Sequence, residues 1–228
     1  MMLMSRSTKI VSRFKVSFPV VWLAFFVGFS CIGCSLIKGP GPNPKYYILS
    51  PVDRGCNDNR HEGRHIQGLS DGVRPEGVVV GPVEIPAYLD RPQMIEKRKE
   101  DRLVISEMHR WAEPIDRAIE RVIAVDLTRL SNGDFEACPF SQNLRRCQAH
   151  PVLRVLISVY SFEAREDGRV VLDARWRIMS PGLRSKVLDR HVCFSKMAKN
   201  VTFDNLPGVM DALIAQLTKD ILSGLRAF

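Results

Sequence analysis

An apolar segment near the N-terminus, ending at Gly33-Cys34, decides how much of this chain is left to fold. Four basic residues and no acidic residue precede it: Arg6, Lys9, Arg13 and Lys15. The apolar run from Val16 to Ser30 is shorter than the ~20 residues that a transmembrane helix needs. A secretory signal consists of a basic region, a short apolar region and a small residue before the cleavage site. We therefore expect residues 1–33 to be a signal peptide.

The residues around Cys34 resemble the lipobox of bacterial lipoproteins, in which a small residue precedes a cysteine at the end of the apolar region. In such proteins the cysteine is acylated, the signal is cleaved, and the cysteine becomes the first residue. The position three before Cys34 is usually Leu and is Cys31 here. The resemblance implies lipidation of Cys34. An ordinary signal peptide and an uncleaved N-terminal anchor are the alternatives.

Residues 34–44 are expected to form the lipidated cysteine and a tether, because Gly39-Pro40-Gly41-Pro42-Asn43-Pro44 blocks regular structure. Residues 45–228 then remain for a single domain. The net charge of +8 is no sign of nucleic-acid binding, since four of the excess cations lie in residues 1–33. No run of basic residues is interleaved with aromatic residues, which a strand-binding groove would need. We therefore expect no nucleic-acid partner.

The hydrophobic pattern of residues 45–228 predicts an α+β fold with a mostly antiparallel (mixed) sheet and two amphipathic helices packed on one face. Short strands are expected at Tyr46–Leu49, Gly77–Pro86, Met94–Lys97 and Arg102–Ser106, and longer ones at Val152–Glu163, Arg169–Met179 and Val187–Lys196. One helix is expected from about Glu113 to Asn132-Gly133, and a second is expected after Asn205. Asp126, amid the apolar side of the first helix, is expected to have an arginine partner or a water-exposed edge.

Four cysteines remain beyond Cys34, and export places them in an oxidising compartment. Cys138 and Cys147 flank a short polar loop, so they form the pair that closes at the least entropic cost. We expect a Cys138–Cys147 disulfide, with four free buried thiols as the alternative. Residues 52–76, which include Cys56, are expected to be a long loop.

The pattern H-E-x-x-H occurs at His61-Glu62-Gly63-Arg64-His65, which could indicate a zinc protease. That chemistry needs a helix, because only there do both histidines lie on one face. A glycine lies between them, no apolar periodicity flanks them, and no third ligand is apparent. No P-loop and no G-x-S-x-G motif occurs. We expect no catalytic residues, no metal and no cofactor, and so not an enzyme.

Four stretches resemble the ABC-type transport auxiliary lipoproteins, the PqiC/YmbA-like family. They are Tyr46-Tyr47-Ile48-Leu49-Ser50-Pro51, residues Val80 to Gln93 (VGPVEIPAYLDRPQ), Trp111-Ala112-Glu113-Pro114-Ile115 and Ala174-Arg175-Trp176. Their spacing covers nearly all of residues 45–228. The chain departs from the pattern in the loop at 52–76 and the cysteine-bearing loop at 138–147.

The resemblance implies a non-enzymatic subunit of an ABC/MCE-type system that transports lipid or organic solvent. Such lipoproteins are anchored in the outer membrane and face the periplasm. Their partners are an MCE-domain protein, which forms a tube between the membranes, and through it an inner-membrane ABC permease; self-association stays open. Ser35 replaces the Asp that signals inner-membrane retention. The alternative function is a periplasmic lipoprotein that scaffolds or regulates cell-envelope enzymes.

A partner surface is expected at Tyr88 to Gln93, beside Trp111. Pro86 and Pro92 bracket this segment, and proline donates no hydrogen bond to a sheet, so the segment should leave the sheet as a stiff connection. It would display Tyr88, Leu89 and Arg91, and Tyr, Trp and Arg dominate binding energy at interfaces. The alternative is that Tyr88 and Trp111 close the end of the core.

Overall fold

The structure is a computed structural model of the 228-residue chain. It describes residues 43–52, 77–142, 152–180, 187–198 and 200–227. Cys34, the H-E-x-x-H pattern at 61–65, the loop predicted at 52–76 except for its first residue, and Cys147 lie outside the described residues. Residues 44–228 form one compact unit, and this unit is described below.

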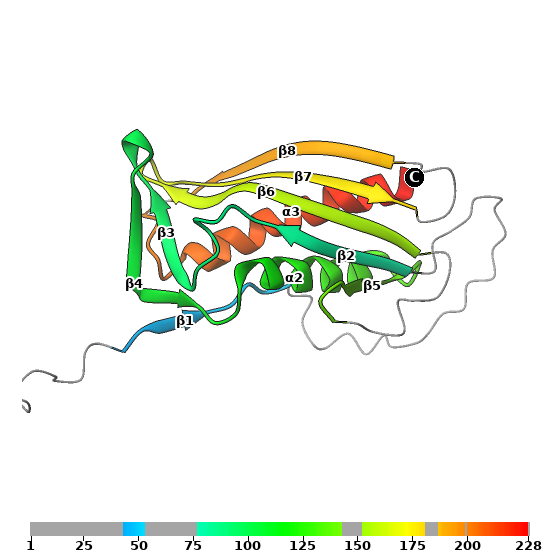
Figure 1. The fold of residues 1–228 in the computed structure, drawn as a ribbon, viewed down its shortest axis with the longest axis horizontal. Helices are drawn as coiled ribbons and strands as arrows, with labels where there is room; N and C mark the ends of the chain where they lie inside the picture. Colours follow the sequence, from blue (N-terminus) through cyan, green and yellow to red (C-terminus); the bar gives the residue numbers. More distant parts are fainter. Residues whose placement is uncertain (1–42, 53–76, 143–151, 181–186, 199, 228) are drawn as a thin grey trace, which may run out of the picture. The chain divides into compact units, whose positions relative to one another are not determined.

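A mixed sheet and two helices make up the described part of the unit (Figure 1). The eight strands are β1 (Lys45–Tyr47), β2 (Gly77–Glu84), β3 (Gln93–Lys97), β4 (Leu103–Trp111), β5 (Glu136–Pro139), β6 (Val152–Arg165), β7 (Arg169–Met179) and β8 (Val187–Met197). Strands run in the order β1-β4-β3-β6-β2-β5, and β7 pairs with both β6 and β8. The predicted α+β class is confirmed.

The predicted hairpins form where turn residues separate two extended runs. β6 and β7 pair antiparallel across Asp167-Gly168, and Gly168 has a φ of +82°, which a residue without Cβ adopts at little cost. β7 and β8 pair antiparallel along their full lengths. β3 and β4 also pair antiparallel, with a 3₁₀ turn at Lys99–Asp101 between them. The β6–β7 and β7–β8 pairings join the three longest strands, which explains why the sequence pattern indicated them.

Parallel pairing is more common in the sheet than the sequence indicated. Three strand pairs are antiparallel, whereas β1–β4, β2–β5, β2–β6 and β3–β6 are parallel. The edge of β6 that faces away from β7 pairs first with β2 and then, at Ala164 and Arg165, with β3. β6 is therefore the strand on which the rest of the sheet is assembled.

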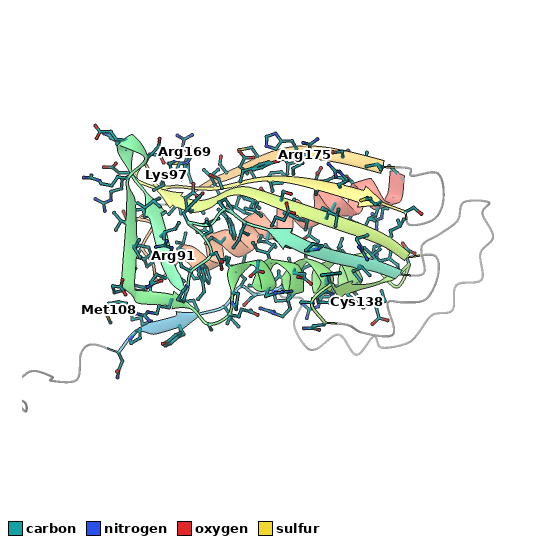
Figure 2. The ribbon with its side chains drawn as sticks, viewed as in Figure 1. Arg91, Lys97, Met108, Cys138, Arg169 and Arg175 are labelled. Atoms are coloured by element: carbon teal, nitrogen blue, oxygen red, sulfur yellow. The ribbon has the colours of Figure 1, made fainter. Side chains whose placement is uncertain are left out.

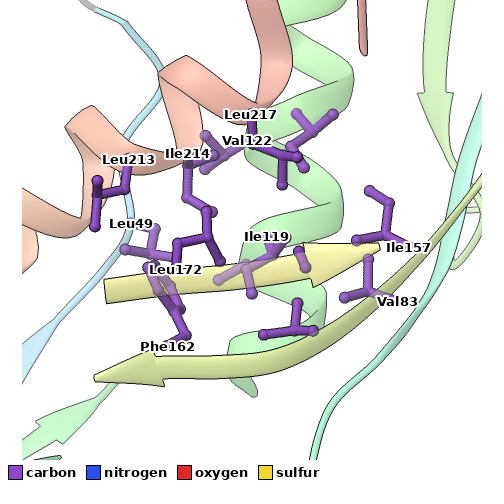
Figure 3. Close-up of a cluster of buried hydrophobic side chains, with 14 of the residues drawn as sticks. Leu49, Val83, Ile119, Val122, Ile157, Phe162, Leu172, Leu213, Ile214 and Leu217 are labelled. Carbon is purple, nitrogen blue, oxygen red and sulfur yellow. The ribbon is translucent and has the colours of Figure 1, made fainter. Parts of the chain in front are cut away.

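Helices α2 (Ile115–Leu130) and α3 (Leu206–Ala227) contact each other and cover one face of the sheet. α2 packs on β2 and β5, and α3 packs on β7 and β8. Figure 3 shows the core between them, where Ile119 and Val122 of α2 meet Ile214 and Leu217 of α3 above the sheet. The stripe predicted on the last helix is buried throughout: Met210, Leu213, Ile214, Leu217, Ile221 and Leu225.

The two helix starts differ in detail from the predictions. Pro114 immediately precedes α2, which begins at Ile115, and no side chain caps that end. Asn205 precedes α3, but its Oδ1 accepts a hydrogen bond from the backbone N of Thr202 at 2.9 Å. Asn205 therefore orders the turn before the helix. At the other end of α2, Asn132 and Gly133 have φ of +56° and +93°, as a helix stop requires.

Gly81 shows why a glycine stands in the middle of β2. Its φ is +108°, and a Cβ there would lie 3.0 Å from Cδ of Glu120. Glu120 is 1 % exposed and accepts a hydrogen bond from the backbone N of Ser141, so its carboxylate has little freedom to move. Conformation and space together require glycine at this position.

Candidate functional site

The segment between β2 and β3 leaves the sheet in two tight turns. The backbone N of Leu89 donates to the carbonyl O of Pro86 at 2.9 Å, and that of Arg91 donates to Leu89 at 2.8 Å. Pro92 then accepts a hydrogen bond from the backbone N of Trp111. The stiff connection predicted between two prolines is present, and it is fixed to the end of β4.

Leu89 and Trp111 point into the core at this end of the unit. They are 6 % and 7 % exposed. With Met94 and the α3 residues Leu206 and Met210 they line a void of about 10 Å³. The prediction that the segment displays Leu89 at the surface is wrong, because turning its backbone twice directs this side chain inward. Trp111 closes the end of the core, which was the alternative prediction.

Tyr88 is half-buried and bonded to a fully buried carboxylate. Its Oη donates to Oε2 of Glu163 at 2.9 Å, and Glu163 is 0 % exposed. The same carboxylate accepts hydrogen bonds from Oγ of Ser161 and from the backbone N of Phe162. Burial, then the charge of Glu163, raises the pKa of Tyr88 to about 12. Tyr88 thus donates a hydrogen bond to a buried carboxylate and keeps part of its ring at the surface.

Arg91 is half-buried, and its Nε is buried with no hydrogen-bond partner among the described residues. Figure 2 places its side chain at the end of the unit where β3 and β4 meet the connection. A buried donor without a partner is destabilising by ~1–3 kcal/mol. Arg91 therefore has unused hydrogen-bonding capacity at this end of the unit.

The same end of the unit holds a polar junction between β1, β4 and the start of α3. Asp204, just before α3, accepts hydrogen bonds from Nζ of Lys45 at 2.8 Å and from Oη of Tyr47 at 2.5 Å. His109 stacks between the rings of Tyr47 and Phe203, with centroids 5.9 and 5.3 Å away. Burial and Asp204 together raise the pKa of Tyr47 to about 12. The junction holds β1 against the helix.

Ser106, His109 and Asp204 have the residue types of a hydrolase triad. Oγ of Ser106 lies 2.8 Å from Nδ1 of His109, and Nε2 lies 3.7 Å from Oδ1 of Asp204. The imidazole also stacks with the rings of Tyr47 and Phe203, so the cluster joins β1, β4 and the residues just before α3. Among the described residues, no three His, Cys, Asp or Glu side chains are placed to hold a metal ion.

Two exposed apolar residues beside this junction were missed by the sequence analysis. Tyr46 is 62 % and Ile48 is 54 % exposed. In the sheet, Tyr46 pairs with Arg110, which also pairs with Gln93 of the connection. We define the corner surface as Tyr46, Ile48, Arg110, Tyr88 and Arg91. The alternation of side chains along β1 and the residues after it was the available signal. Tyr47 and Leu49 face inward, so the alternate residues Tyr46 and Ile48 must face outward.

Cys138, in β5, is disulfide-bonded. Cys193 is free and exposed, so the partner of Cys138 lies outside the described residues. The pairing with Cys147 stays a prediction, as does lipidation of Cys34.

Comparison with known proteins identifies the family to which this chain belongs. The sequence pattern of the family described as "ABC-type transport auxiliary lipoprotein component" matches residues 68–222. The chain belongs to this family. The match includes β2 to β8, α2 and α3 as far as Leu222.

Relatives and solved structures agree with the family assignment. The "Intermembrane transport lipoprotein PqiC" of Escherichia coli K12 is 24% identical over 172 residues, which are 75% of this chain and 76% of that protein. A crystal structure of an uncharacterised protein superposes with a TM-score of 0.61 at 18% identity, covering 80% of this chain and 99% of the other. A Xanthomonas campestris protein superposes with a TM-score of 0.55 at 12% identity, covering 78% and 92%. These two structures show a similarity of fold alone.

The chain is thus an auxiliary lipoprotein component of an ABC-type transport system. Within the residues that the structure describes, no helix is long and apolar enough to cross a membrane.

Proposed function

We propose that this auxiliary lipoprotein is anchored in the outer membrane through Cys34 and links an MCE-domain protein to that membrane. Through the MCE-domain protein it would serve an inner-membrane ABC permease that moves lipid or organic solvent. The observation that carries the proposal is the family match across residues 68–222, together with the likeness to an intermembrane transport lipoprotein. The signal and the Gly33-Cys34 junction in the sequence support the proposed periplasmic anchor.

The corner surface is the proposed contact with the MCE-domain protein. Tyr46 and Ile48 offer exposed apolar area, and Arg91 adds a half-buried guanidinium group. Aromatic and arginine side chains are enriched in the centres of interfaces. Leu89 and Trp111 support this surface from beneath, since Trp111 pairs with Tyr47 and bonds to Pro92.

The test is co-purification with a co-expressed MCE-domain protein from membranes. Tyr46→Ala and Arg91→Ala are each expected to reduce the amount recovered about tenfold or more, as interface hot spots do. Both side chains reach the surface, so the melting temperature should stay close to that of the wild type. Trp111→Ala is unsuitable as evidence of contact, because it removes core packing.

Tyr160→Ala is the matched control. Tyr160 is an exposed tyrosine on β6, 48 % exposed, and it is outside the corner surface. Full recovery of the MCE-domain protein by Tyr160→Ala, with loss in Tyr46→Ala, supports the contact. Equal recovery by all variants would remove the corner surface from the proposal. Recovery of a peptidoglycan synthase in place of the MCE-domain protein would favour the scaffolding function.

A further inference from the structure

A second candidate site lies where the β3–β4 turn meets the β6–β7 turn. The two turns enclose an open cavity of about 660 Å³, and every residue that lines it is charged. This volume lies within the ~300–1,000 Å³ typical of small-molecule sites. We call it the tip cavity. Figure 2 shows two of its residues, Lys97 and Arg169, at the same corner of the unit. A lining without apolar side chains suits a charged ligand.

Cations exceed acids in the tip cavity, and some of the cations are already paired. Its cations are Lys97, Arg98, Lys99, Arg165 and Arg169, and its acids are Glu100, Asp101, Glu166 and Asp167. Lys97 pairs with Asp101 at 2.8 Å, and Arg169 pairs with Asp167 at 2.6 Å. Arg98 pairs with Glu96 at 3.4 Å. Among the described residues, Lys99 and Arg165 have no ion pair.

Arg165 is the group that most needs a partner. It pairs in register with Lys97 across the parallel strands β6 and β3, which sets two cations side by side. Its Nε is buried and has no hydrogen-bond partner among the described residues. Glu163 lies two residues earlier on the same strand, but its carboxylate is used by Tyr88, Ser161 and the backbone N of Phe162. Asp167 lies close enough for Arg165 to help lower the pKa of its carboxyl, but that carboxylate is hydrogen-bonded to Arg169 and forms no ion pair with Arg165 among the described residues.

The turn that forms the opposite wall is held in an uncommon conformation. Glu100 and Asp101 have φ of +59° and +58°, where residues other than glycine are strained. Glu166 anchors this turn, because its Oε2 accepts a hydrogen bond from the backbone N of Lys99 at 3.1 Å. Lys99, in this strained turn, lines the cavity together with Arg165.

We propose that the tip cavity binds a phosphate-bearing anion, with Arg165 as the principal donor and Lys99 as the second. A guanidinium donates two parallel hydrogen bonds to a phosphate, which matches the planar geometry of Arg165. The ammonium group of Lys99 adds charge from the rim. Phosphate of this kind occurs both in anionic lipid headgroups and in small phosphorylated molecules. The site goes beyond the proposed docking to an MCE-domain protein and does not depend on it.

The test is calorimetric titration of the full chain, purified in a nonionic detergent, at low salt. One arm uses inorganic phosphate, and the other uses dihexanoyl-phosphatidylglycerol below its micelle concentration, with dihexanoyl-phosphatidylcholine as the control for the acyl tails. Arg165→Gln is expected to weaken binding about tenfold or more, and Lys99→Gln several-fold. Arg165→Lys, which keeps the charge and the stem, should bind with intermediate affinity if the paired donors matter.

Arg154→Gln and Lys196→Gln are the matched controls, because both remove an exposed strand cation outside the tip cavity. They should bind as the wild type does. Tighter binding of phosphatidylglycerol than of phosphate identifies a lipid headgroup as the ligand, and equal binding identifies a soluble phosphate. The proposal is overturned if the wild type binds neither probe saturably. It is also overturned if Arg154→Gln loses as much affinity as Arg165→Gln.

Discussion

Gly224 lies where α3 presses most closely on the sheet. A Cβ at this position would be 2.4 Å from Cη2 of Trp176 and 3.1 Å from Cδ2 of Leu188. Trp176 is fully buried, and its Nε1 donates to Oδ2 of Asp220 at 2.8 Å, so the indole cannot move aside freely. Glycine is retained inside a helix here because the neighbouring ring takes the space of a side chain.

Gly224→Ala is therefore expected to lower the free energy of unfolding by about 1–3 kcal/mol, the usual cost of overpacking. Gly208→Ala is the control, since no heavy atom lies within 4 Å of its Cβ position. That change should be neutral or stabilising by up to ~1 kcal/mol, because alanine is the better helix former. Urea denaturation of both variants measures the difference. A stable Gly224→Ala protein would contradict the tight contact with Trp176.

Cys138 supports a second prediction, a disulfide with Cys147. A bond that closes a loop of about ten residues contributes ~2–3 kcal/mol if its geometry fits. Peptide mapping without reductant should yield a linked peptide that contains both cysteines. A peptide that links Cys138 to Cys56 would show a different pairing, and unlinked Cys147 would exclude this one.

The extended segment after β1 shows how one short element joins both helices. The backbone N of Ser50 donates to Oδ1 of Asp211 on α3, and that of Val52 donates to Oδ1 of Asp126 on α2, each at 2.9 Å. Arg121 donates to the carbonyl O of Leu49 at 2.9 Å. Asp126 was expected to have an arginine partner or a water-exposed edge. It is 1 % exposed, so the water-exposed edge is wrong, and it accepts this backbone hydrogen bond.

Asp211→Asn tests this clamp through its pH dependence. Burial, opposed by the Ser50 hydrogen bond and assisted by Asp126, raises the pKa of Asp211. The folded state then binds the proton more tightly than the unfolded chain, so stability from Asp211 is greatest at low pH. It is lost as the pH rises through the folded-state pKa. Asparagine keeps the acceptor without the charge, so its stability relative to the wild type should increase from pH 4 to pH 7.

Asp211→Ala is the comparison variant, because it removes the acceptor for Ser50. At pH 7 it should be less stable than Asp211→Asn by about 1 kcal/mol, the usual contribution of a hydrogen bond. Thermal or urea unfolding at both pH values measures these differences. If Asp211→Asn loses stability relative to the wild type as the pH rises, the direction of the pKa shift is wrong.

The proposed attachment of the protein to a membrane depends on a residue that lies outside the described residues. The proposed anchor, Cys34, is followed by only ten residues before β1 begins at Lys45. An extended tether of ten residues spans roughly 30 Å. One acyl chain binds a membrane marginally, whereas two or more anchor a protein stably.

Cys34→Ala is expected to release the protein from membranes or to leave its signal uncut. Fractionation of outer and inner membranes, followed by mass determination of the N-terminus, measures both outcomes. Ser35→Asp, in a chain that keeps Cys34, serves as the companion variant and should move the protein to the inner membrane. A Cys34→Ala protein that is processed and still sediments with outer membranes would refute the anchor.

Local periodicity in the sequence was enough to place the helices and the long strands. The alternation of Leu153, Val155, Ile157 and Val159 predicted one buried face of β6, and all four are buried. The stripe from Met210 to Leu225 predicted the inner face of α3 in the same way. Such patterns depend only on residues close together in the sequence. Side chains point to the same face every two residues in a strand and about every 3.6 residues in a helix.

Contacts between distant residues could be decided only by the tertiary structure. β6 pairs in parallel with β2 and β3, although nothing in the three stretches specifies a shared edge. The burial of Leu89 and the presence of both Arg165 and Lys99 in the lining of the tip cavity likewise depend on contacts between segments distant in sequence. Sequence periodicity determines which face of an element is buried, but packing energy summed over the whole core determines which elements meet.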